Sequence, residues 1–220
     1  MAKISSSLTR SVWVSFLFAL LGGTIAGTLA KFADELSIPG ISMITSHFGI
    51  WVTLVAVIAA WSSSWQRAVL CAVTFLLAMI AAYYVSQMYL FGFFSTHLFV
   101  GWAAAALVLA PPFAILAWPA RKVGWRSALG AALPVGLLLF EMYQLRWRLF
   151  EVYELRWRPD INEDYLLLFV FDCLCALGLF LILPRNGKQR WRTLVLAPVV
   201  MFGVEIMYQY VLPIVVGFRM

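Results

Sequence analysis

Charged side chains are scarce in this chain of 220 residues. Asp, Glu, Lys and Arg together make up 12% of it, whereas hydrophobic residues make up 64%. A soluble domain averages about 25% charged and about 45–50% apolar residues. So few charges cannot cover a surface in water, which excludes a soluble enzyme, a nucleic-acid-binding domain and a disordered chain. The composition predicts an all-α fold, a polytopic bundle of transmembrane helices, whose first partner is the lipid bilayer and which binds no nucleic acid.

Cysteine and catalytic motifs are scarce as well. Three cysteines (Cys71, Cys173 and Cys175) are too few for a disulfide scaffold, and no Cys/His cluster has the spacing of a metal site. The motifs H-E-x-x-H, G-x-S-x-G and the P-loop are absent. We therefore predict no metal site, no cofactor and no catalytic residue. The sequence leaves an enzymatic activity open but gives it no support.

Seven hydrophobic runs approach the roughly 20 residues that a helix needs to cross a bilayer. They predict a single integral membrane domain over residues 1–220, with spans near residues 11–30, 48–62, 68–90, 98–118, 127–145, 165–183 and 193–216. The run at 48–62 is the shortest of the seven. If it does not cross, six spans remain and every later helix reverses its direction.

The distribution of charge predicts an orientation. With the N-terminus in the cytoplasm, the inner segments contain ten Lys and Arg residues and no acidic residue. Cytoplasmic loops of membrane proteins carry such an excess of basic residues. The pattern therefore favours seven spans, a cytoplasmic N-terminus and a place in the bacterial cytoplasmic (inner) membrane.

Two kinds of internal repeat are visible. Pro134 precedes Glu141 by seven residues, and Pro198 precedes Glu205 by seven, which indicates repeated helical hairpins or a chance match between hydrophobic helices. The decamers at 141–150 and 151–160 share six of ten positions, which predicts an outer helical extension over residues 146–160. Its Arg and Trp side chains either rest on lipid headgroups or belong to a solvated overhang.

Three acidic residues lie inside predicted spans: Glu141, Asp172 and Glu205. At a rise of about 1.5 Å per residue, all three come at a similar depth in the outer third of the membrane. An ionised carboxylate in hydrocarbon costs several kcal/mol, so these groups should face the bundle or an aqueous cavity. Whether they converge depends on the rotation of each helix, which the sequence leaves open.

Aromatic residues and histidines surround the same level. Tyr143 and Tyr208 are predicted to lie near the outer helix ends, and His47 and His97 flank the same side. Carboxylates with aromatic rings suit an organic cation, by charge and by cation–π contact. We therefore predict ligand-binding roles for Glu141, Asp172, Glu205, Tyr143, Tyr208 and His97. The alternative is that the carboxylates hydrogen-bond neighbouring helices, and that each histidine is an interfacial residue without a role.

Two resemblances follow from these features. Residues 48–143 resemble small bacterial polytopic membrane proteins of unknown function. The resemblance depends on Trp51 early in the second predicted span, Tyr83 and Tyr84 at the end of the third, Trp102 in the fourth and Glu141 late in the fifth. A weaker resemblance is to the substrate-binding subunits of energy-coupling-factor transporters, in which small residues of the first helix contact a partner subunit. Ala19, Gly23, Gly27 and Ala30 form such a stripe here, which predicts close helix packing.

The sequence thus predicts an integral membrane protein that binds or transports a small, cationic solute through an outward-facing acidic and aromatic site. The alternative is a non-enzymatic accessory or structural protein that acts through a membrane protein partner. In that case the extension at 146–160 would matter and the carboxylates would not.

Overall fold

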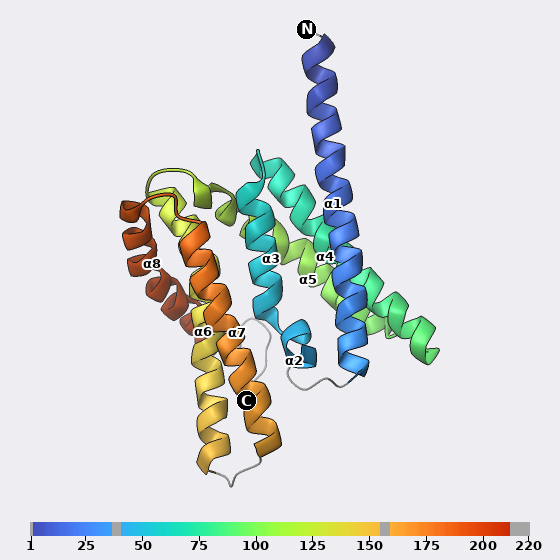
Figure 1. Ribbon diagram of the computed structural model, residues 1–220, viewed down its shortest axis with the longest axis vertical. Coiled ribbons are helices and arrows are strands. Elements are labelled where there is room, and N and C mark those ends of the chain that lie inside the picture. Colours follow the sequence, from blue (N-terminus) through green and yellow to red (C-terminus); the bar gives the residue numbers. More distant parts are fainter. Residues whose placement is uncertain (1, 37–40, 155–158, 212–220) are drawn as a thin grey trace. The chain divides into compact units, whose positions relative to one another are not determined.

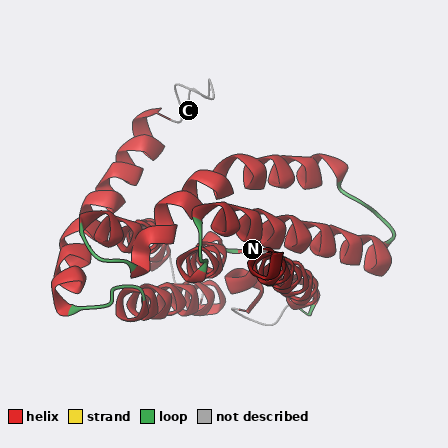
Figure 2. Ribbon diagram, turned by 90° about the horizontal axis from the view of Figure 1, so that it is seen from above, coloured by secondary structure: helices red, strands yellow, loops and turns green. Residues whose placement is uncertain are grey.

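Every regular element is helical among the residues that the computed structural model describes, which are 2–36, 41–154 and 159–211 (Figure 2). This confirms the predicted all-α fold, and the physical reason is that a chain in lipid must satisfy its backbone hydrogen bonds within each segment. The helices are α1 (Ala2–Glu35), α2 (Ile41–Ser46), α3 (Phe48–Trp61), α4 (Trp65–Phe91), α5 (Thr96–Ala117), α6 (Trp125–Glu154), α7 (Pro159–Ile182) and α8 (Gly187–Ile206), with a 3₁₀ turn at Trp118–Arg121 and a π-helical turn at Met207–Val211.

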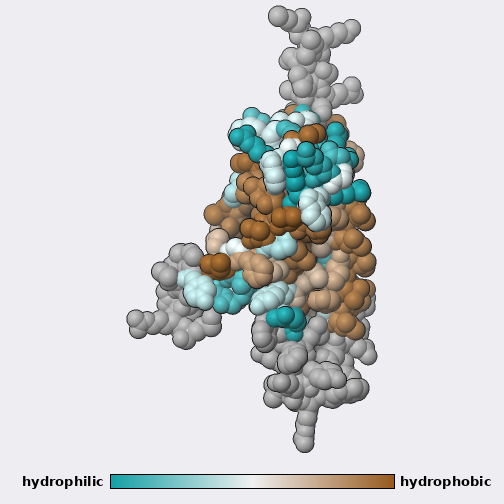
Figure 3. Space-filling model, turned by 90° about the vertical axis from the view of Figure 1, so that its left-hand side faces the viewer, coloured by the Kyte–Doolittle hydropathy of each residue, from teal (hydrophilic) through white to brown (hydrophobic). Residues whose placement is uncertain are grey.

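In the described chain, six helices are long and apolar enough to cross a membrane. These stretches are Val12–Glu35, Trp65–Phe91, Thr96–Arg121, Trp125–Arg146, Asp164–Ile182 and Gly187–Tyr210. Hydrophobic side chains cover much of the face shown in Figure 3, as expected of a surface in contact with lipid. The chain is therefore a multi-pass membrane protein.

The predicted second span forms a helix that is too short to cross the hydrocarbon core of a membrane. α3 has 14 residues, which is about 21 Å of helix, against a hydrocarbon core of about 30 Å. The structure thus agrees with the sequence that this run is the exceptional one. The orientation, and the side on which each loop lies, stay predictions.

The helices group into two compact units (Figure 1). The first contains α1, α2, α4, α5 and the part of α3 from Val55 onward. The second contains the start of α3, from His47 to Leu54, together with α6, α7 and α8. The predicted extension at 146–160 lies partly outside the described residues. α6 continues to Glu154, while residues 155–158 are not described.

In the first unit, the small-residue stripe of α1 lies against α4. A Cβ atom on Gly27 would meet the backbone of Met79, with the carbonyl carbon at 2.8 Å, and one on Gly23 would be 3.0 Å from the Cβ of Ala78. Ala19 and Ala30 are buried on the same helix. Within this chain, therefore, α4 occupies the stripe that would contact a partner subunit in the energy-coupling-factor proteins.

We expect Gly27→Ala to lower the free energy of unfolding by about 1–3 kcal/mol, the usual cost of overpacking, because the new methyl group would push α1 away from the α4 backbone. Gly22→Ala is the matched control, since its Cβ would come no closer than 3.8 Å to the Phe75 ring. Both variants gain the same helix propensity. Thermal unfolding in detergent measures the difference, and equal midpoints would contradict the close approach of the two helices.

The end of α1 differs from the sequence expectation. Lys31, Asp34 and Glu35 were predicted to lie in an outer segment after the first span, but they belong to the last turns of α1. Lys31 is buried, 2.5 Å from the Glu35 carboxylate and 4.9 Å from the centroid of the Phe91 ring. The Tyr83 hydroxyl donates a 2.6 Å hydrogen bond to Asp34. These partners compensate the charges, which allows the helix to continue.

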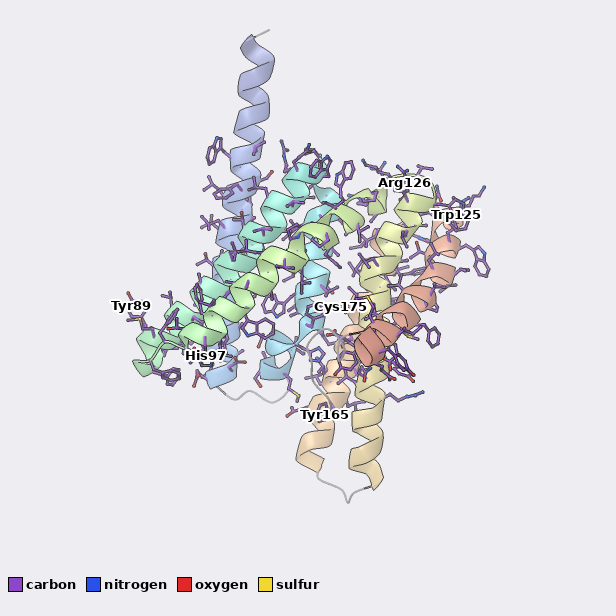
Figure 4. The ribbon with its side chains drawn as sticks, turned by 180° about the vertical axis from the view of Figure 1, so that it is seen from behind. Tyr89, His97, Trp125, Arg126, Tyr165 and Cys175 are labelled. Carbon is purple, nitrogen blue, oxygen red and sulfur yellow. The ribbon has the colours of Figure 1, made fainter. Side chains whose placement is uncertain are left out.

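In the second unit, α6 packs between α7 and α8. Gly136 permits a close approach, because a Cβ there would be 2.7 Å from the Ala197 carbonyl oxygen of α8. At the start of α6, the Gln189 amide of α8 donates to the Ala120 carbonyl oxygen at 2.7 Å. Figure 4 shows Trp125 and Arg126 at this end of the unit and Tyr165 toward the other. These contacts fix the rotation of α6 and thus the direction in which Glu141 points.

Candidate functional site

Three elements of the second unit each contribute one residue to a polar cluster formed by His47, Glu141 and Asp172. His47 immediately precedes α3, Glu141 lies on α6, and Asp172 lies on α7. Glu141 comes five residues before its apolar stretch ends at Arg146, and Asp172 eight residues after its own begins at Asp164. These offsets correspond to about 8 and 12 Å along the helices. The cluster therefore lies within the membrane-spanning part of α6 and α7, toward their connected ends.

The polar atoms of the cluster are close to one another and largely hidden from solvent. One ligand atom from each residue can be chosen so that all three lie within 4.8 Å of one another. His47 Nδ1 is 3.5 Å from Glu141 Oε1. Asp172 is 0% exposed and Glu141 9%, while the His47 side chain is 30% exposed. The cluster is therefore accessible to solvent on the side of His47.

Hydrogen bonding in the cluster is incomplete. Both carboxylate oxygens of Asp172, Oε2 of Glu141 and Nδ1 of His47 are buried without a hydrogen-bond partner among the described residues. A buried polar atom left in this state costs about 1–3 kcal/mol, and more when it is charged. Buried polar groups are normally paired, so an exception requires an explanation, and one explanation is an ion that binds to them.

Gly49 gives the two carboxylates the space to meet. It lies in the first turn of α3, two residues after His47. A Cβ atom at this position would be 2.7 Å from Glu141 Oε2 and would clash with Asp172 Oδ1. Any residue other than glycine would therefore displace at least one carboxylate. The backbone of α3 forms one wall of the cluster.

The electrostatics of the cluster are dominated by the two acids. Burial lowers the pKa of His47, but the carboxylates of Glu141 and Asp172 outweigh this and raise the pKa above its ordinary value. In the described chain, no lysine or arginine forms an ion pair with Glu141 or Asp172. When both carboxylates are ionised, the cluster is negative even with a protonated imidazole. The arrangement is suited to attract a cation.

The third predicted carboxylate, Glu205 of α8, has partners of its own. The Gln144 amide of α6 donates to Glu205 Oε2 at 2.6 Å, and Gln209 donates to Oε1. Although Glu141 and Glu205 occupy equivalent places in the Pro-to-Glu repeat, only Glu205 has both oxygens hydrogen-bonded. Its arrangement is that of a helix-to-helix link.

The other predicted site residues lie outside the cluster. The Tyr143 ring has the Arg146 guanidinium 4.7 Å from its centroid, and the Tyr208 ring packs against Phe140 at 5.8 Å. His97 is exposed at the start of α5 in the first unit (Figure 4). Of the six residues predicted to bind a ligand, the structure brings together Glu141 and Asp172.

His47 and Gly49 are the members that sequence reasoning did not assign. The sequence predicted that His47 flanks the level of the carboxylates on the outer side, but it assigned no ligand-binding role to this residue. The spacing of ligands along the chain gave no signal, because the three residues are 94 and 31 positions apart. The sequence feature that could have linked them is depth: His47, Glu141 and Asp172 were all predicted to lie near the same level of the membrane.

A comparison with known families gives one match. Residues 6–212 match the model described as Family of unknown function (DUF6518). No curated protein and no solved structure matches the chain significantly. The match confirms the resemblance to an uncharacterised family, and nothing in the comparisons supports the resemblance to energy-coupling-factor subunits.

Proposed function

Because this chain belongs to the DUF6518 family, whose function is unknown, we propose its function from the geometry of the second unit: it is a membrane protein that binds a small cation among α3, α6 and α7, as a binding or transport protein. The observation that carries the proposal is Asp172. Its carboxylate is fully buried, neither of its oxygens has a hydrogen-bond partner in the described part of the chain, and it lies beside a second buried carboxylate.

A cation supplies what this cluster lacks. Two carboxylates close together in a low-dielectric interior repel each other, and each also loses its hydration. A bound cation would offset both penalties at once, since it accepts the unpaired oxygens as ligands and neutralises their charge. Ionisable residues inside membrane segments often mark ion or substrate pathways.

A purely structural role explains the cluster less well. Structural carboxylates in membrane helices hydrogen-bond across the helix interface, which is what Glu205 does with Gln144. Among the described residues, Asp172 has no such contact, and Glu141 has only the approach of His47 Nδ1 to its Oε1 at 3.5 Å. The same unit therefore contains one acid with the geometry of a structural link and two with the geometry of ligands.

We expect Glu141→Gln to weaken cation binding at least tenfold, whereas Glu205→Gln changes it less than twofold. The amide at position 141 removes one charge and one strong ligand but keeps the size of the side chain. Native mass spectrometry of the purified protein measures binding, with Mg²⁺, Zn²⁺, Mn²⁺, K⁺ and tetramethylammonium added one at a time.

The pair of variants also provides the contrary outcomes. If Glu205→Gln abolishes binding and Glu141→Gln does not, the site lies at α8, and Tyr143 and Tyr208 regain their predicted roles. If no probe binds the wild-type protein, the proposed function is wrong. The accessory alternative depends on the extension at 146–160, and it stays a prediction that deletion of residues 151–160 would test.

A further inference from the structure

The donor atoms of the cluster narrow the choice of cation. They comprise one imidazole nitrogen, from His47, and carboxylate oxygens from Glu141 and Asp172. Mg²⁺ and Ca²⁺ prefer sites made entirely of oxygen. Imidazole nitrogen is a favoured ligand of Zn²⁺ and other first-row transition metals, which also accept carboxylates. A quaternary organic cation cannot accept a lone pair from the imidazole nitrogen.

Resting on the cation binding proposed above, we infer that the ion is a divalent first-row transition metal, of the class of Mn²⁺, Fe²⁺, Co²⁺ and Zn²⁺. It is held by Nδ1 of His47 and by one oxygen from each of Glu141 and Asp172. This assignment concerns one residue that precedes α3 and two that lie on α6 and α7, which no sequence motif connects.

The spacing of the donor atoms agrees with such an ion. Metal–nitrogen and metal–oxygen bonds of about 2.0–2.2 Å in tetrahedral geometry separate neighbouring ligand atoms by about 3.3–3.5 Å. His47 Nδ1 and Glu141 Oε1 are 3.5 Å apart. One ligand atom from each of His47, Glu141 and Asp172 can be chosen so that all three lie within 4.8 Å of one another.

The charge of the cluster favours a divalent ion over a monovalent one. Two ionised carboxylates and a neutral imidazole carry two negative charges, which a divalent metal balances fully. With the same neutral imidazole, a monovalent cation would leave one buried negative charge without compensation, which is unfavourable in a low-dielectric interior. Charge and donor type therefore select the same class of ion.

The number of ligands indicates an exchangeable site. Three protein ligands leave at least one coordination position for water or another ligand, as in metal sites that are not purely structural. The His47 side chain, which is 30% exposed, lies on the side from which such a ligand would enter. An open site of this kind can load and release its ion, as binding or transport requires.

The test is equilibrium dialysis of the full-length protein in detergent against Zn²⁺, Mn²⁺, Ca²⁺ or Mg²⁺, followed by elemental analysis. We expect one equivalent of Zn²⁺ or Mn²⁺ per chain at concentrations where Ca²⁺ and Mg²⁺ do not bind. His47→Gln should weaken transition-metal binding at least tenfold. Pulsed electron paramagnetic resonance of Mn²⁺ bound to the wild-type protein should show coupling to one imidazole nitrogen, a readout that does not depend on the folding of any variant.

The outcomes separate this inference from the proposed function. Equal affinity for Ca²⁺ and Zn²⁺, or bound Mn²⁺ without nitrogen coupling, would overturn the inference but leave a cation site at Glu141 and Asp172. If only K⁺ or tetramethylammonium binds, and Glu141→Gln abolishes that binding, the transition-metal inference is likewise wrong and the cation site at Glu141 and Asp172 remains. If none of these cations binds, both the inference and the proposed function are wrong.

Discussion

Replacing Asp172 with asparagine should raise the thermal stability of the ion-free protein. Most substitutions of a fully buried residue destabilise a protein. Asp172 differs because both of its carboxylate oxygens are buried without a partner and because Glu141 repels it at close range. An uncharged amide of the same size removes the charge from the interior. The amide still buries an oxygen and an NH₂ group, so the gain comes from removing the buried charge and its repulsion by Glu141; we expect about 1–3 kcal/mol.

The same variant should lose its response to metal. A ligand that binds only the folded state stabilises it by about 2.7 kcal/mol at one hundred times its dissociation constant. In a chain of this length, 1 kcal/mol corresponds to about 2–4 °C in the unfolding midpoint. We therefore expect the wild-type midpoint to rise by about 5–10 °C on adding Zn²⁺ after chelation, and that of Asp172→Asn to stay nearly constant.

Thermal unfolding in detergent with EDTA, then with Zn²⁺, gives both results in one series. Glu205→Ala is the control, because removing this acid should lower the unfolding midpoint, whereas Asp172→Asn should raise it. That residue accepts hydrogen bonds from Gln144 and Gln209, so its loss should lower the midpoint with or without metal. If Asp172→Asn instead destabilises the chelated protein, its carboxylate has a structural partner and the argument for a cation site fails.

The contrast between Glu141 and Glu205 shows which features of the site the sequence can predict and which it cannot. Hydrophobic length alone predicted the helices, because lipid requires long apolar segments. It also placed the three acids at a common depth, since depth follows from the rise per residue. Depth says nothing about rotation about the helix axis. Rotation is set by contacts such as Gly136 of α6 with Ala197 of α8, which hydropathy does not record.

Two further differences have similar causes. The sequence predicted a first span over residues 11–30, with Lys31 outside it. The structure continues the helix because Glu35, Tyr83 and Phe91 surround that lysine, and α4 provides the two rings. Glu141 and Glu205 were both predicted to bind a ligand, but the Gln144 amide donates its hydrogen bond to Glu205. In both cases a neighbouring helix decides the role of a residue.

Gly49 offers the test of the site that removes no ligand. Gly49→Ala should weaken Zn²⁺ or Mn²⁺ binding at least tenfold, because the added methyl carbon would lie 2.7 Å from Glu141 Oε2 and would clash with Asp172 Oδ1. The carboxylates would have to separate, and a metal ion tolerates little change in ligand distance. All three ligands and their charges remain, so a loss of affinity would arise from geometry alone.

Gly178→Ala on α7 is the matched control, since nothing lies within 4 Å of its added Cβ. Both variants replace a helical glycine and gain up to about 1 kcal/mol in helix propensity, so a general effect on helix stability would appear in both. Equilibrium dialysis with elemental analysis measures binding for the pair. Undiminished binding in Gly49→Ala would mean that the ion does not lie where α3, α6 and α7 meet, even if Glu141 or Asp172 proves necessary by another route.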